Sequence, residues 1–240
     1  MKKISVVVPA HNEEKCIRDV ISAVLRQDYP DFEMIVVDNA SKDHTYEYAK
    51  EFPITVAKEE RKGTQWAREC GRNLAKGEII AYLDSDCIPD KDWLSKASKI
   101  FDDEKVVAVT GPYDYYDSSF SFRLISLWIQ KYIYSVNNVI LQFFKKGAVL
   151  IGGNMLIRAS SLRDIGGLDT SIVFYGDDTD TAKRLSAVGQ IYFEKNLIMK
   201  TSDRRFKGHG IFKTMMSYFI TFYSTTFFGK SAVKNHKDFR

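Results

Sequence analysis

The sequence has only three cysteines, Cys16, Cys70 and Cys87. They are scattered and odd in number, with no Cys-x-x-Cys pair. This argues against a disulfide framework and a structural zinc site and fits a reducing cytoplasm. Long apolar runs are also absent: no stretch of about 18 residues lacks polar side chains, so no transmembrane helix is predicted. The apolar run at the N-terminus stops at Pro9, too short for a signal peptide.

A strong charge of either sign is also missing. There are 35 Lys and Arg against 31 Asp and Glu, a net charge of +4. This mild basic excess is too weak to indicate a nucleic-acid partner, and it fits an anionic substrate or an acidic membrane surface. Hydrophobic residues make up 45% of the chain, enough for a sizeable core, so we expect one large domain, with or without a small appendage.

The first half alternates short apolar runs with segments of helical periodicity. Strands are predicted at residues 4–8, 34–37, 54–56 and 79–83. Helices are predicted from residues 12–14 through Val24, from Ser41 or Asp43 through Ala49, and over residues 63–75. This order indicates an α/β fold with parallel strands and right-handed crossovers.

The second half is richer in aromatic residues. Helical spacing predicts helices over residues 120–144, 177–188 and 211–228, and a strand is expected within residues 149–157 around Gly152-Gly153-Asn154. The 211–228 stretch has an apolar face next to several lysines, which is typical of a helix that lies on an anionic membrane. The alternative is that this helix and the 120–144 helix pack on the sheet or form a homo-oligomer interface.

Polar clusters follow three of the predicted strands. His11-Asn12-Glu13, Asp38-Asn39 and Asp84-Ser85-Asp86 each come directly after an apolar run. Ligands of open α/β sheets bind beyond the carboxyl ends of the strands, so these loops should converge on one crevice. Carboxylates suit Mg²⁺ or Mn²⁺. An ordinary polar turn is the alternative for Asp84-Ser85-Asp86.

Taken in order, these motifs resemble those of family 2 glycosyltransferases with the GT-A fold. The matching segments are residues 6–14, residues 36–45, Lys62-Gly63 with Ala67-Arg68 and Gly71, residues 84–86, residues 152–154, and residues 176–180 through Arg184-Leu185. The resemblance implies a GT-A (Rossmann-like) fold, with a mostly parallel central sheet flanked by helices and amphipathic helices at the C-terminal end. It also implies an inverting transferase that uses Mn²⁺ or Mg²⁺ and a nucleotide-diphospho-sugar donor, of which a UDP-sugar is expected.

The resemblance assigns roles to individual residues. The donor would be bound by Pro9, Ala10, Asn12, Glu13, Asp38, Lys62, Gly63, Arg68, Asp84, Ser85 and Asp86. Within this set Asp38 would accept a hydrogen bond from the imide N–H of uracil, and Asp86, with Asp84, would ligate the metal. The alternatives are a turn cap for Asp38 and a solvated helix face for Lys62 and Arg68.

Asp178 occupies the position of the base that takes the proton of the acceptor hydroxyl in inverting members. Asp177 stands where the family usually has the longer Glu, with a role in binding the acceptor, and Asn154 would face the donor sugar or the acceptor. The alternative for the acidic residues is helix capping, with Asp180 paired to Arg184.

A basic loop follows these motifs. Arg204 and Arg205 are candidates for the diphosphate, because guanidinium groups bind phosphate in a bidentate way. His209, between two glycines, is a weaker candidate for a third metal ligand. The resulting domain prediction is a GT-A domain over residues 1–203, with a nucleotide-sugar half (1–112) and an acceptor half (113–203), followed by the basic loop and amphipathic helix (204–240).

Alternatives remain at this point. A polyprenyl-phosphate glycosyltransferase would need no base, because its acceptor is already an anion. A nucleotidyltransferase would need a glycine-rich loop after the first strand, and Pro9-Ala10-His11-Asn12 has no glycine. A non-catalytic nucleotide-sugar-binding protein would lack one of the carboxylates. The Gln-x-x-Arg-Trp motif of processive synthases is absent, which favours transfer of a single sugar to a glycan or lipid-linked acceptor, in the cytoplasm or at the cytoplasmic face of the membrane.

Overall fold

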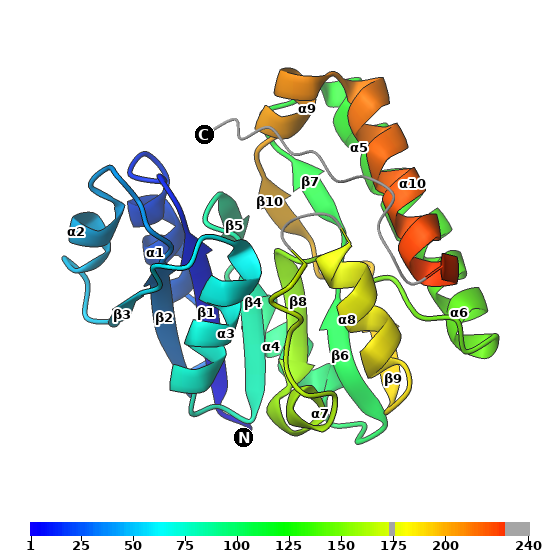
Figure 1. Ribbon diagram of the computed structural model, residues 1–240, viewed down its shortest axis with the longest axis horizontal. Coiled ribbons are helices and arrows are strands. Elements are labelled where there is room, and N and C mark those ends of the chain that lie inside the picture. Colours follow the sequence, from blue (N-terminus) through cyan, green and yellow to red (C-terminus); the bar gives the residue numbers. More distant parts are fainter. Residues whose placement is uncertain (173–175, 229–240) are drawn as a thin grey trace.

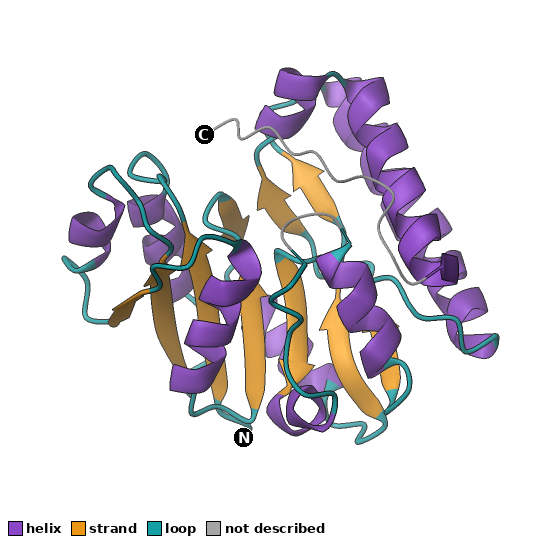
Figure 2. Ribbon diagram, viewed as in Figure 1, coloured by secondary structure: helices purple, strands orange, loops and turns teal. Residues whose placement is uncertain are grey.

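Seven strands form the central sheet, in the order β3-β2-β1-β4-β8-β6-β9 (Figures 1 and 2). The structure is a computed structural model that describes residues 1–172 and 176–228, without the side chains of His209, Phe212, Phe227 and Phe228. The strands of this sheet are β1 Ile4–Ala10, β2 Phe32–Asp38, β3 Thr55–Lys58, β4 Ile79–Leu83, β6 Val106–Thr110, β8 Asn154–Arg158 and β9 Gln190–Phe193.

Most neighbours in this sheet are parallel. β1 pairs in parallel with both β2 and β4, and β2 pairs with β3, so the carboxyl ends of these strands share one edge. The register sets Ala10, the last residue of β1, opposite Asp38, the last residue of β2. Only β8 runs antiparallel to its neighbours β4 and β6. The mostly parallel α/β sheet is therefore confirmed, and the polar loops predicted to converge do share an edge.

Helices cover both faces of the sheet (Figure 2). They are α1 Ile17–Leu25, α2 Thr45–Ala49, α3 Thr64–Leu74, α4 Trp93–Ile100, α7 Ala159–Asp164 and α8 Asp177–Leu185. Val6 and Val8 of β1 lie in the core cluster that contains the apolar side of α1, whereas Val7 lies in the cluster that contains Ala67 of α3. Successive strand side chains point to opposite faces, so a strand buried on both sides reads as an unbroken apolar run.

Several predicted boundaries differ from those of the structure, and two of them have a clear cause in the backbone. The first helix begins at Ile17 and not at residues 12–14, because Asn12 has a positive φ of 53°, which an α-helix does not allow. The strand expected within residues 149–157 begins only at Asn154. The residues before Asn154 form a turn, in which the Asn154 amide donates to the carbonyl of Ile151 at 2.9 Å.

A second sheet of three short strands stands above the first. Its order is β5-β10-β7, with bounds β5 Cys87–Pro89, β7 Tyr113–Tyr115 and β10 Met199–Thr201. β5 starts immediately after Asp84-Ser85-Asp86, so this motif links the end of β4 in the large sheet to the small sheet. The sequence analysis did not predict this sheet, because three-residue strands carry too little periodicity to be recognised.

Aromatic helices form one end of the molecule. Residues 120–143 make one continuous helical segment, composed of α5 Phe120–Trp128, the π-helix η1 Ile129–Tyr134 and α6 Ser135–Phe143. Near the C-terminus follow α9 Arg204–His209 and α10 Ile211–Phe228. Both groups lie at the end of the molecule opposite α1 and α2 (Figure 1). Within the described residues no helix combines the length and the apolar character that a membrane span needs.

Candidate active site

The loops after β1 and β2 are joined by hydrogen bonds. The Asn12 amide donates to Ser41 Oγ at 2.9 Å, and the Lys42 amide donates to Asn12 Oδ1 at 2.8 Å. Asn12 and Ala40 both have positive φ, 53° and 54°. Such backbone is rare outside glycine and persists only where surrounding contacts hold it. Asn12 was predicted to contact the donor, and in the structure it connects the two loops. The connection lies at the edge of the sheet where Pro9 and Ala10 end β1.

Asn39 orders the loop that leads into α3, and sequence reasoning missed this role. Its Nδ2 donates to the carbonyls of Glu59 and Arg61 at 2.9 and 2.8 Å, and its Oδ1 accepts from the Gly63 amide at 2.8 Å. Gly63 has a φ of 137°, which requires glycine at this position. Lys62, the preceding residue, is exposed. The only sequence signal for Asn39 was its place directly after the second strand.

Asp38 has an unused acceptor. It ends β2 and is only 3% exposed. Its Oδ1 is buried and has no hydrogen-bond partner among the described residues. An unpaired buried polar atom costs about 1–3 kcal/mol. Asp38 thus keeps one acceptor that no described residue satisfies.

Arg68 connects two acidic clusters that are distant in sequence. The guanidinium is 3% exposed, and its Nη2 and Nη1 donate to Asp84 Oδ1 at 2.9 Å and to Asp177 Oδ2 at 3.0 Å. Gln65, one turn earlier on α3, also donates to Asp177 Oδ2, at 2.7 Å. Burial opposes the charge of Arg68, but the two carboxylates outweigh it and raise its pKa above the ordinary value. Arg68 is therefore not on a solvated helix face.

The acidic pair at the start of α8 has perturbed protonation. Burial, and next the charge of Asp177, raise the pKa of Asp178 to about 7. Burial also raises the pKa of Asp177. The Thr179 amide donates to Asp178 Oδ1 at 2.8 Å, which favours the charged form and limits the shift. A carboxyl with a pKa near neutrality can accept a proton and release it again.

The three acids at the start of α8 have different partners. Asp180 accepts from Arg184 Nε at 2.8 Å in an i,i+4 ion pair, as the spacing predicted. Asp177 accepts from the side chains of Gln65 and Arg68 on α3. Asp178 Oδ1 accepts from the amide and the hydroxyl of Thr179, at 2.8 and 3.5 Å.

Asp84, Asp86 and Cys87 form the candidate metal site. One ligand atom from each lies within 4.8 Å of the others. Burial raises the pKa of the Cys87 thiol well above its ordinary value, and the two carboxylates are the hard oxygen donors of the group. Gly153 faces them: a Cβ at this glycine would lie 2.5 Å from Asp84 Oδ2. The pair of hard oxygen ligands fits Mg²⁺ or Mn²⁺.

Arg204 reaches this site from the C-terminal segment. Its Nη2 lies 2.6 Å from Glu13 Oε1 and 2.9 Å from Asp86 Oδ2, and its Nη1 donates to Glu13 Oε2 at 3.0 Å. Burial raises the pKa of Asp86, while the charge of Arg204 acts against that rise. Arg205 donates to Tyr218 at 2.8 Å, and the charges of Asp84 and Asp86 help to raise its pKa. Both arginines therefore belong to the acidic site.

Of the remaining predicted site residues, Asn154 and Ser85 are buried, and the side chain of His209 is not described. Asn154 is fully buried: its Oδ1 accepts from Trp93 Nε1 at 2.9 Å and its Nδ2 donates to the Leu197 carbonyl at 2.7 Å. In this structure it supports the core and does not line the site. Ser85 is 5% exposed, and its backbone links the two acids. The His209 side chain is outside the part of the chain that the structure describes.

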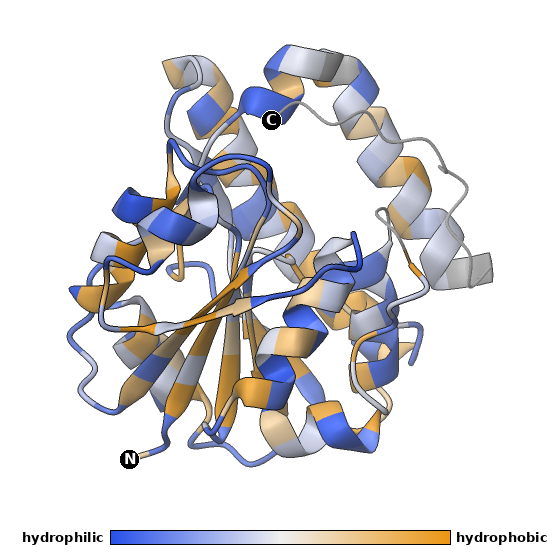
Figure 3. Cartoon of the chain, turned by 60° about the vertical axis from the view of Figure 1, so that its left-hand side comes forward, coloured by the Kyte–Doolittle hydropathy of each residue, from blue (hydrophilic) through white to orange (hydrophobic). Residues whose placement is uncertain are grey.

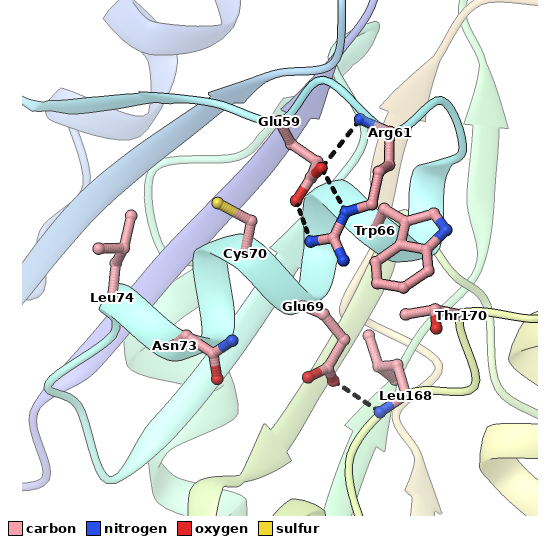
Figure 4. Close-up of a pocket in the computed structure, with 9 residues that line it drawn as sticks. All are labelled: Glu59, Arg61, Trp66, Glu69, Cys70, Asn73, Leu74, Leu168 and Thr170. Atoms are coloured by element: carbon pink, nitrogen blue, oxygen red, sulfur yellow. Dashed lines mark hydrogen bonds and ion pairs between the residues drawn. The ribbon is translucent and has the colours of Figure 1, made fainter.

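A separate hollow of about 480 Å³ lies on the other side of α3 (Figure 4). Its lining residues on that helix are Trp66, Glu69, Cys70, Asn73 and Leu74. These positions share one helical face, at i, i+3, i+4, i+7 and i+8. Arg68 lies on the opposite face and points to the acids. The hollow is thus separated from the acidic site by α3.

The fold defines a class of protein. A mostly parallel sheet flanked by helices is the GT-A fold, which the solved structures described below share. The sequence agrees: the family description "Glycosyl transferase family 2" matches residues 5–166. The chain belongs to this family.

Individual relatives carry similar names. The chain is 27% identical to "Glycosyltransferase AglE" of Haloferax volcanii over 203 residues, which covers 81% of this chain and 65% of AglE. It is 29% identical to "Probable glycosyltransferase YdaM" of Bacillus subtilis over 212 residues, 79% of this chain and 48% of YdaM. The chain thus spans less than two thirds of the length of each of these relatives.

Solved structures show the same fold. The mannosyltransferase PcManGT of Pyrobaculum calidifontis, in complex with GDP-Man and Mn²⁺, superposes with a TM-score of 0.74 at 23% identity, over 96% of this chain and 66% of PcManGT. TarS of Staphylococcus aureus in complex with UDP-GlcNAc gives a TM-score of 0.60 at 20% identity, over 84% of this chain and 58% of the TarS chain. At these identities the likeness concerns the fold.

Proposed function

We propose that the chain is an inverting, metal-dependent glycosyltransferase that moves one sugar from a nucleotide-diphospho-sugar donor to an acceptor hydroxyl. The observation that carries the proposal is the bridge made by Arg68, which holds Asp84 of the proposed donor side and Asp177 of the proposed acceptor side on one buried guanidinium. A transfer reaction needs the leaving group and the attacking group within one site, and Arg68 joins the two halves.

Asp86 and Asp84 are the residues that would hold the divalent cation. Their oxygens are close enough together, and the missing Cβ of Gly153 lets the Asp84 carboxylate lie against this part of the backbone. A bound cation would neutralise the charge that develops on the diphosphate as the glycosidic bond breaks. The protein itself supplies Arg204 and Arg205 near the same position, and we assign both to the diphosphate.

Asp178 is the proposed base. The acceptor hydroxyl would pass its proton to Asp178 while its oxygen attacks the anomeric carbon from the face opposite the diphosphate. The raised pKa suits this task, because a base with a pKa near the working pH takes and releases the proton with little energetic cost. Asp177, kept in place by Gln65 and Arg68, would orient the acceptor.

Asp38 is proposed to read the base of the nucleotide. Its unpaired, buried Oδ1 suits the imide N–H of uracil, which supports a UDP-sugar as donor. The solved structures of similar fold hold GDP-Man in one case and UDP-GlcNAc in another. Pro9 and Ala10 at the end of β1, with Lys62 and Gly63 of the loop before α3, would complete the proposed nucleotide pocket.

We propose that the reaction serves glycolipid, cell-wall or polysaccharide assembly, in the cytoplasm and at the cytoplasmic face of the membrane. Three unpaired cysteines fit a reducing compartment. TuaG of Bacillus subtilis, named for teichuronic acid biosynthesis, is 38% identical over 99 residues, 39% of this chain.

A donor screen tests the reaction. The protein is incubated with a panel of UDP-, GDP-, dTDP- and ADP-sugars and Mn²⁺ or Mg²⁺, and release of the nucleoside diphosphate is measured. We expect release with at least one uridine donor, and strongly reduced release with Asp178→Asn. A panel in which no sugar nucleotide binds, measured by calorimetry, would contradict the proposal.

A further inference from the structure

The helical segment 120–143 carries a continuous apolar stripe on its outer side. Seven apolar residues at every fourth position are exposed, and the last of them directly follows the segment: Phe120, Leu124, Trp128, Tyr132, Val136, Ile140 and Phe144. Their side chains are 48–74% exposed. An i, i+4 series winds slowly around an α-helix of about 3.6 residues per turn. In the wider turn of the π-helix η1 each residue rotates through a smaller angle, which offsets part of this drift.

Helix α10 has a polar buried side and an apolar exposed side, the reverse of a surface helix that packs on a protein core. Its buried side chains include Thr214, Thr221, Thr225 and Thr226, all at most 5% exposed. Its outward side chains are Ile211, Met215, Met216, Phe219, Ile220 and Tyr223, with 38–59% exposed. A surface helix in water presents its polar residues outward, and this one presents its apolar residues.

The two stripes belong to one end of the molecule (Figure 1). Phe222 of α10 and Tyr134 of η1 both pack on the small buried cluster of Val149, Ile151 and Phe193. Figure 3 shows α10 from another side, running down the edge of the molecule away from the sheet. The inner sides of both helices are thus anchored on the same cluster, and their outer sides face away from the domain. We call these outward apolar side chains of segment 120–144 and α10 the aromatic surface.

The sequence segments that carry the aromatic surface contain basic residues and no acidic ones. The sequence contains no Asp or Glu between Asp117 and Asp164, and none between Asp203 and Asp238. These two acid-free segments contain both helices. Lys145, Lys146 and Lys213 are exposed and make no ion pair among the described residues. A basic, acid-free border around an apolar face is complementary to an anionic lipid surface.

We propose that the aromatic surface binds an anionic lipid bilayer, with both helices lying in the plane of the membrane. The apolar side chains would enter the boundary between headgroups and acyl chains, and the lysines would contact lipid phosphates. Trp128, 58% exposed in mid-helix, suits the interface because its ring has an apolar body and one polar N–H. This binding goes beyond the transfer reaction and does not depend on it.

Flotation with vesicles tests the proposal on the full chain. We expect the protein to float with phosphatidylcholine vesicles that contain phosphatidylglycerol, to float less in high salt, and to float poorly with phosphatidylcholine alone. Trp128→Glu with Phe219→Glu removes one apolar contact from each helix and should lower the bound fraction at least about tenfold. Both side chains are exposed, 58% and 59%, so the fold should tolerate the change.

A matched control places two glutamates elsewhere. Leu74→Glu with Val188→Glu alters exposed apolar residues, 42% and 45% exposed, that lie outside the aromatic surface, and it should leave flotation unchanged. The blue shift of tryptophan fluorescence on adding vesicles should disappear in Trp128→Phe. Light scattering in the absence of lipid is measured on every variant, and circular dichroism confirms that each is folded.

Two outcomes would overturn the proposal. One is a wild type that stays with the soluble fraction at low salt in the presence of anionic vesicles. The other is a wild-type dimer in solution that the Trp128→Glu and Phe219→Glu pair converts to a folded monomer, which would make the aromatic surface an interface between two copies of this chain.

Discussion

Arg204 Nη2 lies 2.9 Å from Asp86 Oδ2, and the same nitrogen lies 2.6 Å from Glu13 Oε1. A basic side chain of helix α9 thus rests on the carboxylate that we assign to the metal. Glu13 is only 2% exposed, so its charge has little contact with water and depends on this arginine. A cation that binds Asp86 has to share that carboxylate with Arg204 or displace it. The displaced guanidinium would then be free to contact the diphosphate.

Asp86→Ala should abolish sugar transfer. Because the carboxylate is the proposed ligand, we expect a loss on the order of 10²–10³-fold in kcat, together with loss of Mn²⁺ binding in calorimetry. Asp90→Ala is the matched control, since Asp90 is an exposed carboxylate of the same region that pairs with Lys200. Chelator should inactivate the wild type, and undiminished turnover in excess chelator would contradict the metal assignment.

Arg204→Gln should affect the metal and the nucleotide in opposite directions. Without the competing charge, Asp86 should bind Mn²⁺ more tightly in the absence of donor. Binding of the nucleoside diphosphate should weaken by about 10–100-fold, because a hydrogen bond to a charged group contributes about 1.5–3 kcal/mol. Both affinities are measured by calorimetry. Lys207→Gln, on the same helix but paired with Asp117 and Asp203, should change neither. If both variants weaken metal and nucleotide alike, Arg204 has only a structural role.

Asp178→Asn should lower kcat by about 10²–10⁴-fold, the usual contribution of a general base. The base works in its charged form, and burial with the charge of Asp177 raises the pKa of Asp178 to about 7. Therefore kcat/KM of the wild type should rise with pH and level off above about 7. The residual activity of the variant should lack this step. Full activity in Asp178→Asn would instead favour a lipid-phosphate acceptor, which needs no base.

The same substitution should stabilise the protein at high pH. Since the pKa of Asp178 is raised from an ordinary value of 3.8 to about 7, the folded chain binds this proton more tightly than the unfolded chain does. The stability contributed by the protonated form is present in full below pH 3.8 and is lost as pH rises through 7. At pH 8 Asp178→Asn should melt a few °C above the wild type, and near pH 4 the difference should be small. A lower Tm for the variant at pH 8 would show that burial does not destabilise the charged form of Asp178.

Asp38→Asn should weaken the binding of uridine diphosphate. The asparagine keeps the size of the side chain but removes the charge that would accept the imide N–H, so we expect a loss of about 10–100-fold. The wild type should bind uridine diphosphate more tightly than adenosine diphosphate in calorimetry. A preference for the adenosine nucleotide, or equal binding in Asp38→Asn, would remove Asp38 from base recognition.

The strands of the nucleotide half could be predicted because their signal is local. Val6, Val7 and Val8 lie on both faces of a buried parallel strand, so the run itself marks the element. The strand ends carry Asp38 and Asp84, and the topology of parallel strands brings such ends to one edge. The acids of α8 and the pair between Asp180 and Arg184 also follow from spacing along one helix.

The division at residue 203 remains a prediction about function. The fold has an element boundary there, because α9 begins at Arg204. Arg204 nevertheless contacts Glu13 and Asp86, so the C-terminal segment takes part in the same site as the first half of the chain.

The sequence by itself determined the alternation of strands and helices, the family and the acids at the strand ends, because each depends on neighbouring residues or on a motif read in order. Only the tertiary structure decided which side chains meet. Arg68 bridges Asp84 and Asp177, Arg204 rests on Asp86, and Asn154 turns into the core. The outward orientation of the apolar face of α10 was also decided there. The periodicity of a helix shows that an apolar face exists, but whether that face meets protein or solvent depends on the elements packed around it.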